Sequence, residues 1–279
     1  QIQLRAKNVI LATGGYGANP EMRPEKVKDV LYYGPMSSAG DGHQMASKVG
    51  AKLHSMEKMK VYPHGVEIAP GRGKSTSRGS RIAVAEGAIF VNSAGERVID
   101  ESVDMVSLKR TTLKQPGQRV FLVMDSDQFA KFRDSDPAWT LQEIEEYIQR
   151  PGRFSKNDDL AAAAKEMGID PAGLSATIES YNNYVKQGAD PDFGRSSLPA
   201  PIAKPPFHIV EQKPRTATTL GGVKVTLNME VLDANNQPIP GLLAAGEIIA
   251  GAHGEESMPG CCTAWAFISG RIAGKKAAQ

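Results

Sequence analysis

The chain has 279 residues, of which 33 are basic and 31 are acidic, and its formal net charge at pH 7 is +2. A balance this even argues against nucleic acid as a partner, because no basic excess is available to neutralise phosphates. The longest apolar runs fall far short of the about 20 residues that a spanning helix needs. We therefore expect no membrane span.

Cys261 and Cys262 are the only cysteines, and they are adjacent. Neighbouring cysteines rarely bond because the bridge would be strained, so no disulfide framework is expected. This favours a reducing compartment, the cytoplasm, with the periplasm as the alternative. His, Cys and carboxylate residues show no metal-ligand spacing, so no metal is expected.

The second strand pattern of the chain leads into two glycines. Residues 1–7 alternate like a strand already in progress and lack an initiator methionine, which indicates a fragment of a longer protein. Residues 8–11 form a second strand pattern, followed at once by Ala12-Thr13-Gly14-Gly15. Two glycines there permit positive φ and let backbone N–H groups face a phosphate or sugar. A plain tight turn is the alternative.

Gly40-Asp41-Gly42 opens a helix predicted over residues 43–49, which ends at Gly50. An aspartate at a helix start is most often an N-cap. No G-x-G-x-x-G follows a strand in this chain, so the dinucleotide fingerprint is absent.

Composition changes between residues 58 and 204. Residues 62–64 and 71–81 are expected to be loops, and the Pro-rich residues 199–206 a connector. Between them the patterns predict strands over 88–92 and 120–125, a hairpin at 93–100, and helices over 159–167 and 171–187.

The C-terminal part of the chain is again predicted to contain strands. Residues 207–210 and 222–226 are predicted strands, and a hairpin is expected around Asn235-Asn236. A turn at Pro240-Gly241 leads into a buried strand over 242–245. Gly246-Glu247 then places a carboxylate at the strand's C-terminal end, where open α/β sheets bind ligands. A glycine-rich crossing and a helix follow; an ordinary strand–loop–helix corner is the alternative.

Several motifs resemble those of the fumarate reductase/succinate dehydrogenase flavoprotein superfamily. They are TGGYGAN and GDG-x-x-MA near the start, the helical residues 158–195, and PGLLAAGE, GAHG and GRIAG near the end. The resemblance implies an α/β protein: a Rossmann-like FAD-binding domain in residues 1–57 and 207–279, split around an α+β capping domain in residues 58–206. The family's fingerprint lies upstream of the TGG turn. A missing N-terminal segment or a separate chain is therefore expected to complete the site.

The resemblance also implies how a non-covalent FAD would be held. The TGG turn approaches the adenosine end, Glu247 accepts hydrogen bonds from FAD hydroxyls, and the start of the last helix meets the flavin pyrimidine. The cofactor-binding residues expected on this basis are Ala12, Thr13, Gly14, Gly15, Asp41, Gly246, Glu247, Cys262 and Thr263.

By the same resemblance the reaction is hydride transfer between flavin N5 and a C–C bond of a small organic substrate. The family's proton-donating arginine corresponds to Met105, and a thioether donates no proton. Four other positions of the family's dicarboxylate site hold Arg81, Val84, Thr218 and Ser257. We therefore expect a substrate other than fumarate or succinate.

Four residues are candidates for the proton chemistry: Tyr62 and His64 at the start of the cap, Arg110 after Met105, and His253 in the glycine crossing. A histidine titrates near neutrality and can move a proton. For His64 an exposed loop histidine is the alternative, and Arg110 would require a shifted helix register. The alternative function is a non-catalytic fragment or binding module derived from such a flavoprotein.

Overall fold

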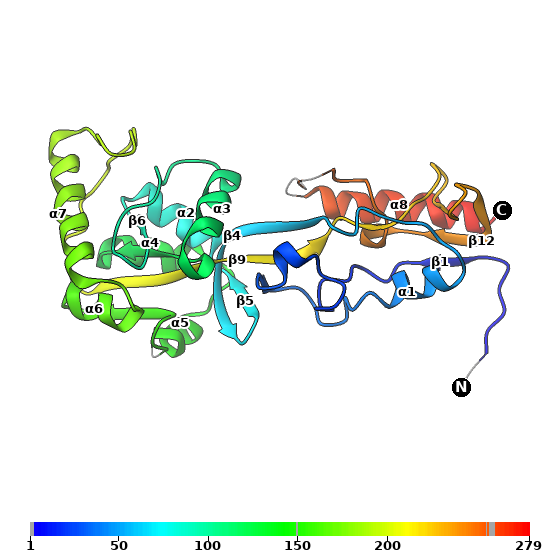
Figure 1. The fold of residues 1–279 in the computed structure, drawn as a ribbon, viewed down its shortest axis with the longest axis horizontal. Helices are drawn as coiled ribbons and strands as arrows, with labels where there is room; N and C mark the ends of the chain where they lie inside the picture. The colour runs from blue at the N-terminus through cyan, green and yellow to red at the C-terminus, as the bar shows by residue number, and fades with distance from the viewer. Residues whose placement is uncertain (1–2, 149, 255, 257–259) are drawn as a thin grey trace. The chain divides into compact units, whose positions relative to one another are not determined.

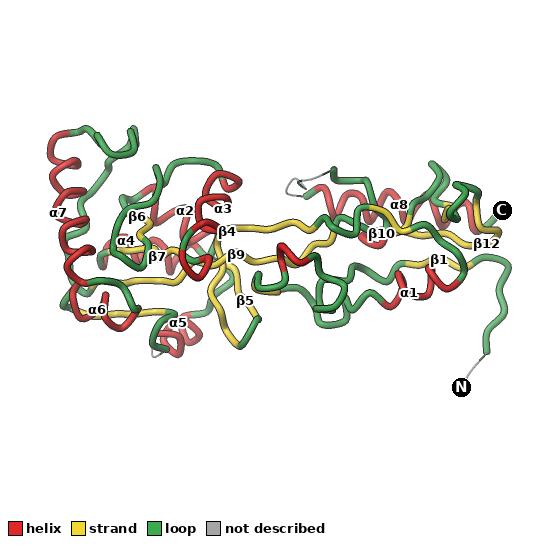
Figure 2. The backbone as a smooth tube through the Cα atoms, in the orientation of Figure 1, coloured by secondary structure: helices red, strands yellow, loops and turns green. Residues whose placement is uncertain are grey.

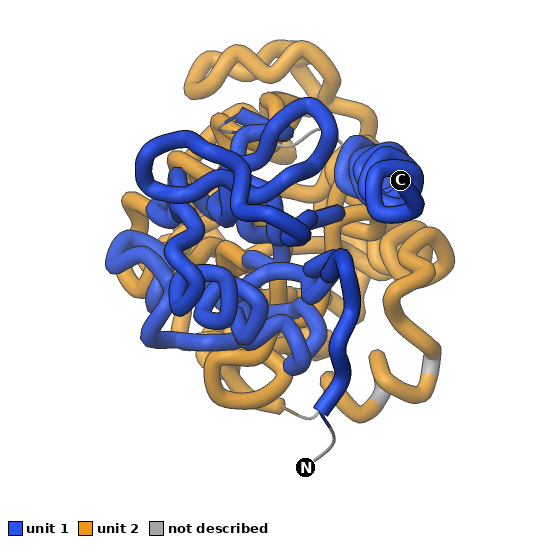
Figure 3. The backbone as a smooth tube through the Cα atoms, turned by 90° about the vertical axis from the view of Figure 1, so that its right-hand side faces the viewer, with its two compact units in different colours: residues 1–61, 216–279 blue, residues 62–215 orange. Residues whose placement is uncertain are grey.

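The computed structural model describes residues 3–148, 150–254, 256 and 260–279. The chain mixes helices and strands, which confirms the α/β class predicted from the sequence (Figures 1 and 2). It divides into two compact units, residues 1–61 with 216–279 and residues 62–215 (Figure 3). Among the helices of the described ranges, none is long and apolar enough to cross a membrane.

The first unit is built on a three-stranded sheet in the order β1-β12-β11. β1 (Val9–Leu11) runs parallel to β12 (Pro238–Ala244), and β11 (Glu230–Leu232) is antiparallel to β12. The remaining elements of this unit are η1 (Glu25–Val27), β2 (Leu31–Tyr32), α1 (Asp41–Lys48), β3 (Leu53–His54), β10 (Gly222–Val223), η3 (Gly246–Ile248) and α8 (Cys261–Ala277). Helix α8 packs on β12 and β1.

The core of the first unit joins segments from both ends of the chain. Leu11 from β1, Ala46 from α1, Leu243 from β12 and Ala273 from α8 belong to one buried cluster. This burial supplies the hydrophobic stabilisation that pairs β1 with a strand more than two hundred residues away in sequence. The ends of β1 and β12 are thereby fixed next to each other.

The second unit surrounds a larger sheet, in which the order β5-β4-β9-β7-β6 is continuous and β8 also pairs with β9. Its strands are β4 (Met59–Ala69), β5 (Arg72–Ser75), β6 (Ile89–Val91), β7 (Val120–Met124), β8 (Phe154–Asn157) and β9 (Phe207–Thr219). Its helices are α2 (Ser77–Ala85), α3 (Met105–Lys114), η2 (Pro116–Gln118), α4 (Ser126–Ser135), α5 (Leu141–Ile148), α6 (Leu160–Met167) and α7 (Pro171–Gln187).

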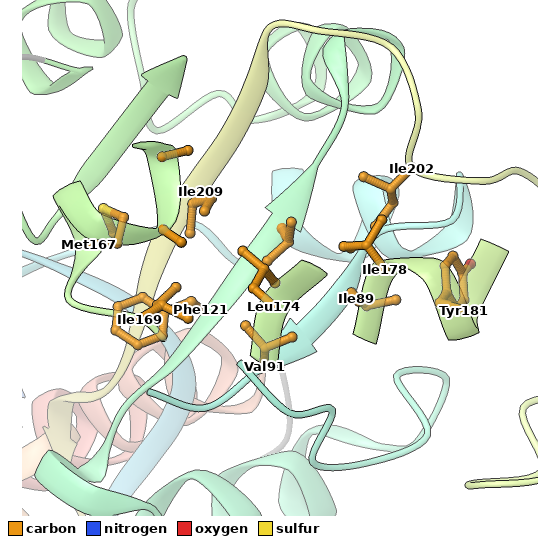
Figure 4. Close-up of a cluster of buried hydrophobic side chains, with 13 residues drawn as sticks. Ile89, Val91, Phe121, Met167, Ile169, Leu174, Ile178, Tyr181, Ile202 and Ile209 are labelled. Atoms are coloured by element: carbon orange, nitrogen blue, oxygen red, sulfur yellow. The ribbon is translucent and has the colours of Figure 1, made fainter. Parts of the chain in front are cut away.

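Helices cover both faces of this sheet, and β7 shows why. Phe121 and Val123 enter one buried cluster with α6 and α7, whereas Val120, Leu122 and Met124 enter another with α2, α3 and α4. Side chains alternate between faces along a strand, so an uninterrupted apolar run is buried on both sides. Figure 4 shows the first cluster, in which Leu174 and Ile178 of α7 meet Ile89 and Val91 of β6.

Most predicted elements are present. Helix α7 has the bounds 171–187 that the sequence predicts, and Leu174, Ile178 and Tyr181 are buried as expected. The predicted strands 8–11, 88–92 and 120–125 correspond to β1, β6 and β7, and the hairpin around Asn236 joins β11 to β12. The unit boundaries fall inside β4 and β9, whereas the domain boundaries expected from the sequence fall just before these strands.

Some predictions were wrong. Residues 3–7 form no strand, and Pro240-Gly241 lies inside β12 rather than in a turn before it. The expected loop 62–64 is part of β4, and the expected loop 71–81 contains β5 and most of α2. Glycine in α2 serves close packing: a Cβ at Gly79 would lie 2.8 Å from the carbonyl oxygen of Phe132 in α4. The glycine that reads as a loop signal therefore marks a helix–helix contact.

Candidate functional site

The carboxyl ends of β1 and β12 meet at one edge of the first unit's sheet. Leu11 lies opposite Ala244 in register, and the backbone N–H of Ala245 donates to the carbonyl of Leu11 at 2.8 Å. The chain leaves β1 into Ala12–Gly15 and leaves β12 into Gly246-Glu247. Both segments therefore start from the same edge, which is where parallel α/β sheets bind ligands.

Gly15 lies against the carboxylate of Glu247. A Cβ at Gly15 would be 2.3 Å from Oε1 of Glu247 and 2.2 Å from Oγ1 of Thr219. The same Oε1 accepts hydrogen bonds from the backbone N–H and the hydroxyl of Thr219, both at 2.8 Å. The second oxygen, Oε2, makes no hydrogen bond to the described residues, which leaves it as an acceptor for a ligand.

The same edge includes the start of α1. Its N-cap is Gly40 (φ 85°), and Asp41 is its first residue and is exposed, so the expected N-cap role of Asp41 is not observed. A Cβ at Gly42 would lie 1.9 Å from Oγ1 of Thr13, which fixes α1 against the β1 turn. Gly14 has φ 72°, a conformation that favours glycine.

Gly246 is held by α8. Its N–H donates to Oγ of Ser269 at 2.9 Å, and Nε1 of Trp265 donates to its carbonyl at 3.1 Å. Cys262 and Thr263 lie in the first turn of α8, whose leading N–H groups have no partner within the helix. That end of a helix stabilises negative charge. The arrangement suits a ligand that carries negative charge.

His43 in α1 was missed by the sequence reasoning. Its side chain is fully buried, and neither ring nitrogen has a hydrogen-bond partner among the described residues. Burial lowers the pKa of His43 to about 4, against an opposing effect from the backbone of Gly221. Its ring packs edge-on against Tyr16, with centroids 5.1 Å apart. A histidine inside a helix pattern carries no sequence signal of this kind.

The second unit contains a cavity of about 660 Å³. His64, Arg81, Glu101, Met105 and Arg195 are among its lining residues. This volume lies within the range of about 300–1,000 Å³ typical of small-molecule sites. The cavity brings together one predicted catalytic residue, His64, and three positions at which the sequence departs from the dicarboxylate site, Arg81, Val84 and Met105.

His64 is 3% exposed, not the exposed loop residue that was the alternative interpretation. Its Nδ1 lies 3.2 Å from Oε1 of Gln212, which also accepts from the hydroxyls of Thr76 and Ser80. Burial, and then the nearby cations Arg215 and Arg81, lower the pKa of His64 to about 4 against the opposing effect of Gln212. The imidazole is therefore neutral at pH 7.

Four charged residues form a buried network at the cavity, two of them, Glu101 and Arg195, in its lining. Arg97 donates to Glu101 at 3.0 and 2.8 Å and to Asp190 at 3.1 and 3.0 Å. Arg195 donates to Glu101 at 3.0 Å and to the carbonyls of Ala88 and Val84. Two cations and two carboxylates, each with at most 4% of its side chain exposed, neutralise one another.

The register of α3 is fixed by its cap. Asp104 accepts from the N–H groups of Val106 and Ser107 at 2.7 and 3.1 Å, so α3 begins at Met105. Met105 lines the cavity, whereas Arg110 is exposed and is not part of the lining. On a helix with 3.6 residues per turn, Arg110 lies on a different face from Met105. The register shift that would bring Arg110 to the position of Met105 is not observed.

The other predicted residues lie elsewhere. Tyr62 is in β4, outside the cavity lining, with the guanidinium of Arg215 4.9 Å from its ring centroid. His253 belongs to the first unit, where it is half-buried in a bend. Ser257 lies outside the described residues. In the described part of the chain no group of His, Cys, Asp and Glu is arranged to hold a metal ion.

A family model described as "FAD binding domain" matches residues 1–263. The chain belongs to this flavoprotein family. The resemblance to fumarate reductase/succinate dehydrogenase flavoproteins is thereby confirmed, and the glycine turns at the ends of β1 and β12 lie within the matched residues.

Several proteins that are similar to this chain are named as reductases. A probable fumarate reductase, Ifc3, of Shewanella frigidimarina is 33% identical over 98% of this chain and 44% of its own length. A urocanate reductase of Eggerthella lenta is 32% identical over 98% and 45%. A vinyl phenol reductase of Lactiplantibacillus plantarum is 32% identical over 97% and 60%. The chain spans about half the length of the first two.

Solved structures agree with the fold. The open conformation of a flavocytochrome c3 fumarate reductase matches with a TM-score of 0.79 at 33% identity, over 98% of this chain and 46% of the other. A 3-ketosteroid Δ1-dehydrogenase from Sterolibacterium denitrificans matches with a TM-score of 0.71 at 24% identity, over 98% and 53%. At that identity the second match supports the fold alone.

Proposed function

We propose that the protein is an FAD-dependent oxidoreductase that transfers hydride between flavin N5 and a C–C bond of a small organic substrate. The observation that carries the proposal is the meeting of Gly15 and Glu247 where β1 and β12 end. The relatives named for the reduction of fumarate, urocanate and vinyl phenol support it, because each of these compounds has a C=C bond. In this proposal the first unit binds FAD and the second covers the substrate.

The residues at this edge fit FAD. Gly15 lets the backbone of the β1 turn approach the cofactor, and Oε2 of Glu247 is available to accept from its hydroxyls. The first turn of α8, with Cys262 and Thr263, would stabilise negative charge on the flavin pyrimidine and so favour the reduced state. The cofactor, held non-covalently, supplies hydride transfer; these residues position it and set its charge environment.

The site is completed in this proposal by a further segment, either upstream in the same protein or in a separate chain. Within the described sheet, β1 is an edge strand, and its Val9 and Ile10 are 50% and 38% exposed. An exposed apolar edge strand is a template for another strand. The missing glycine fingerprint would be on the segment that pairs there.

The substrate in this proposal is neither fumarate nor succinate. Met105 occupies the position matched to the family's proton-donating arginine and lines the cavity, and its thioether donates no proton. Of the other matched positions, Arg81 and Val84 also line the cavity; Val84 offers no charge, and Arg81 offers one positive charge for two carboxylates. The loss of these groups removes the partners that two carboxylates would need.

The test uses the protein together with the segment that completes the site, whether that segment is upstream in the same protein or in a separate chain. We expect it to purify with bound FAD, visible as the yellow flavin absorbance and released by denaturation without proteolysis. The reduced protein should be reoxidised by an alkene that bears an activating group. A preparation that binds no FAD when it is supplied would refute the proposal. Bound FAD that no alkene reoxidises would favour the alternative, a binding module derived from such a flavoprotein.

A further inference from the structure

Gln212 in β9 is a buried residue that uses only one end of its amide. Its Oε1 is the hydrogen-bond acceptor for three groups: Nδ1 of His64 at 3.2 Å, the hydroxyl of Thr76 at 3.0 Å and the hydroxyl of Ser80 at 3.2 Å. Its Nε2 is enclosed and has no partner among the described residues. An apolar side chain would avoid the cost of an unpaired buried N–H, which indicates that the amide oxygen does more than fill space.

The hydrogen-bond network assigns the orientation of this amide. The hydroxyls of Thr76 and Ser80 lie 3.2 Å apart, and each has one hydrogen to donate. If the amide were turned round, its NH₂ group would face both hydroxyls, and one hydroxyl hydrogen would have no acceptor among the described residues. With Oε1 facing them, every hydroxyl hydrogen is accepted. Nδ1 of His64 must then carry the ring proton, because an unprotonated Nδ1 would face the lone pairs of Oε1 with no hydrogen between them.

This tautomer leaves the lone pair of His64 on Nε2. Nε2 has no hydrogen-bond partner in the described part of the chain, and, unlike both ring nitrogens of His43, it is not fully enclosed. His64 lines the cavity, so Nε2 is open to a ligand there. The backbone of His64 is held as well, because its carbonyl accepts from Nε of Arg215 at 2.6 Å and from the N–H of Thr76 at 3.2 Å. The ring therefore presents an acceptor to the cavity from a fixed position.

The charges around the ring favour its neutral form. Burial lowers the pKa of His64, and Arg215 from β9 and Arg81 from α2 lower it further. Gln212 accepts from Nδ1 without a charge, whereas a carboxylate in its place would stabilise the imidazolium. The remaining charged groups of the lining are Glu101 and Arg195, which belong to the buried neutral network, and Asp104, which caps α3.

We propose that Gln212 is a positioning residue: it keeps the proton of His64 on Nδ1 and presents the Nε2 lone pair to the cavity as a proton acceptor. The inference rests on the proposed function in taking the cavity as the place where the substrate's proton moves. In the direction of C–C oxidation, one carbon loses its proton to Nε2, its neighbour loses hydride to the flavin, and the C=C bond forms. In the opposite direction, Nε2 must first take a proton from water and then give it to carbon.

The first test reads the tautomer in the 279-residue chain, without flavin or substrate. Long-range ¹H–¹⁵N spectra of the histidine rings should show His64 protonated at Nδ1 alone at pH 7. Gln212→Leu should move the proton to Nε2, where water in the cavity can accept it. Ser80→Ala is the matched control, because it removes another hydrogen bond of the same Oε1 and should leave the tautomer unchanged. A proton on Nε2 in the unsubstituted chain, or on Nδ1 in Gln212→Leu, would overturn the inference.

Gln212→Glu tests the same contact with a side chain of the same shape, and it replaces Gln212→Leu if that variant does not fold. The added negative charge should raise the pKa of His64 by about 1–3 units. In the protein together with the segment that completes the site, the pH profile of flavin reoxidation by an alkene should move upwards by the same amount. An unchanged pKa of His64 or an unchanged profile would overturn the inference. If no FAD binds, the proposed function fails, whereas the Nδ1 tautomer and its dependence on Gln212 are still measured in the chain alone.

Discussion

The Cα of Gly15 faces the carboxylate of Glu247 so closely that a methyl group between them would lie 2.3 Å from Oε1. These residues come from opposite ends of the chain and are joined because β1 pairs in parallel with β12. Thr219 fixes the orientation of Glu247 through two hydrogen bonds to the same oxygen. The close approach is thus built into the fold of the first unit.

Gly15→Val should weaken FAD binding at least tenfold, because the added side chain would displace Glu247 and Thr219 from this edge. The measurement is FAD affinity by fluorescence quenching in the protein together with the segment that completes the site. Gly270→Ala is the control, since a Cβ at this α8 position meets no atom within 4 Å. Equal affinity in Gly15→Val and the unsubstituted protein would contradict the proposed cofactor edge.

The buried charge network should be indispensable to the second unit. Glu101→Gln leaves Arg97 and Arg195 with one carboxylate between them, so we expect the free energy of unfolding to fall by about 3–5 kcal/mol. Asp127→Asn provides the comparison, because Asp127 pairs with Lys204 where both side chains are about two-thirds exposed. That change should cost less than about 1 kcal/mol. Urea denaturation measures both; similar losses would show that the network contributes little.

Helices α2 and α8 should respond oppositely when one glycine in each is replaced by alanine. Gly79→Ala brings a methyl group within 2.8 Å of a carbonyl of α4 and should destabilise by about 1–3 kcal/mol. Gly274→Ala in α8 meets nothing within 4 Å and should stabilise by about 0.5–1 kcal/mol through helix propensity. Thermal unfolding monitored by circular dichroism gives both signs. A gain from Gly79→Ala would mean that α2 does not need glycine to approach α4.

Stability should fall in mild acid. Burial lowers the pKa values of His43, His64 and His208 to about 4. In the unfolded chain these histidines titrate near 6.5, so between pH 6.5 and 4 the unfolded state binds more protons than the folded state. The contribution of these neutral histidines to the free energy of unfolding is complete above pH 6.5 and is lost as the pH falls towards 4.

His208→Phe isolates one of these groups. His208 stacks on Phe129 with ring centroids 3.8 Å apart, a contact that phenylalanine can keep. Between pH 7 and pH 5 the variant should lose about 1–2 kcal/mol less of its unfolding free energy than the unsubstituted chain. The same pH dependence in both proteins would show that His208 is not neutral in the folded state.

The sequence predicts those features that depend on local pattern. Local pattern determines α7 through the spacing of its apolar residues and β7 through its continuous apolar run. It also determines the hairpins, through their glycine and asparagine residues. Gly246-Glu247 was predicted to end a strand facing a ligand, and the structure brings it to the TGG turn. Whether these residues contact FAD stays a prediction.

Features that depend on tertiary packing were not predictable. The sequence around Gly79 predicts a loop, and only the close contact with Phe132 of α4 shows why a helix has glycine at this position. His64 follows a proline and reads as exposed, yet pairing between neighbouring strands buries it beside Gln212 of β9. His43 is one polar residue in a helix pattern, and only the packing of Tyr16 shows that it is buried.

The central claim is that the edge formed by Thr13, Gly15, Gly246 and Glu247 contacts FAD. Its most direct test is a titration of the isotope-labelled 279-residue chain with FAD, followed by ¹H–¹⁵N correlation spectra. We expect the amide resonances of these four residues to shift first, even if the affinity of this chain is weak. FAD-induced shifts confined to residues 62–215, with none at the ends of β1 and β12, would contradict the account.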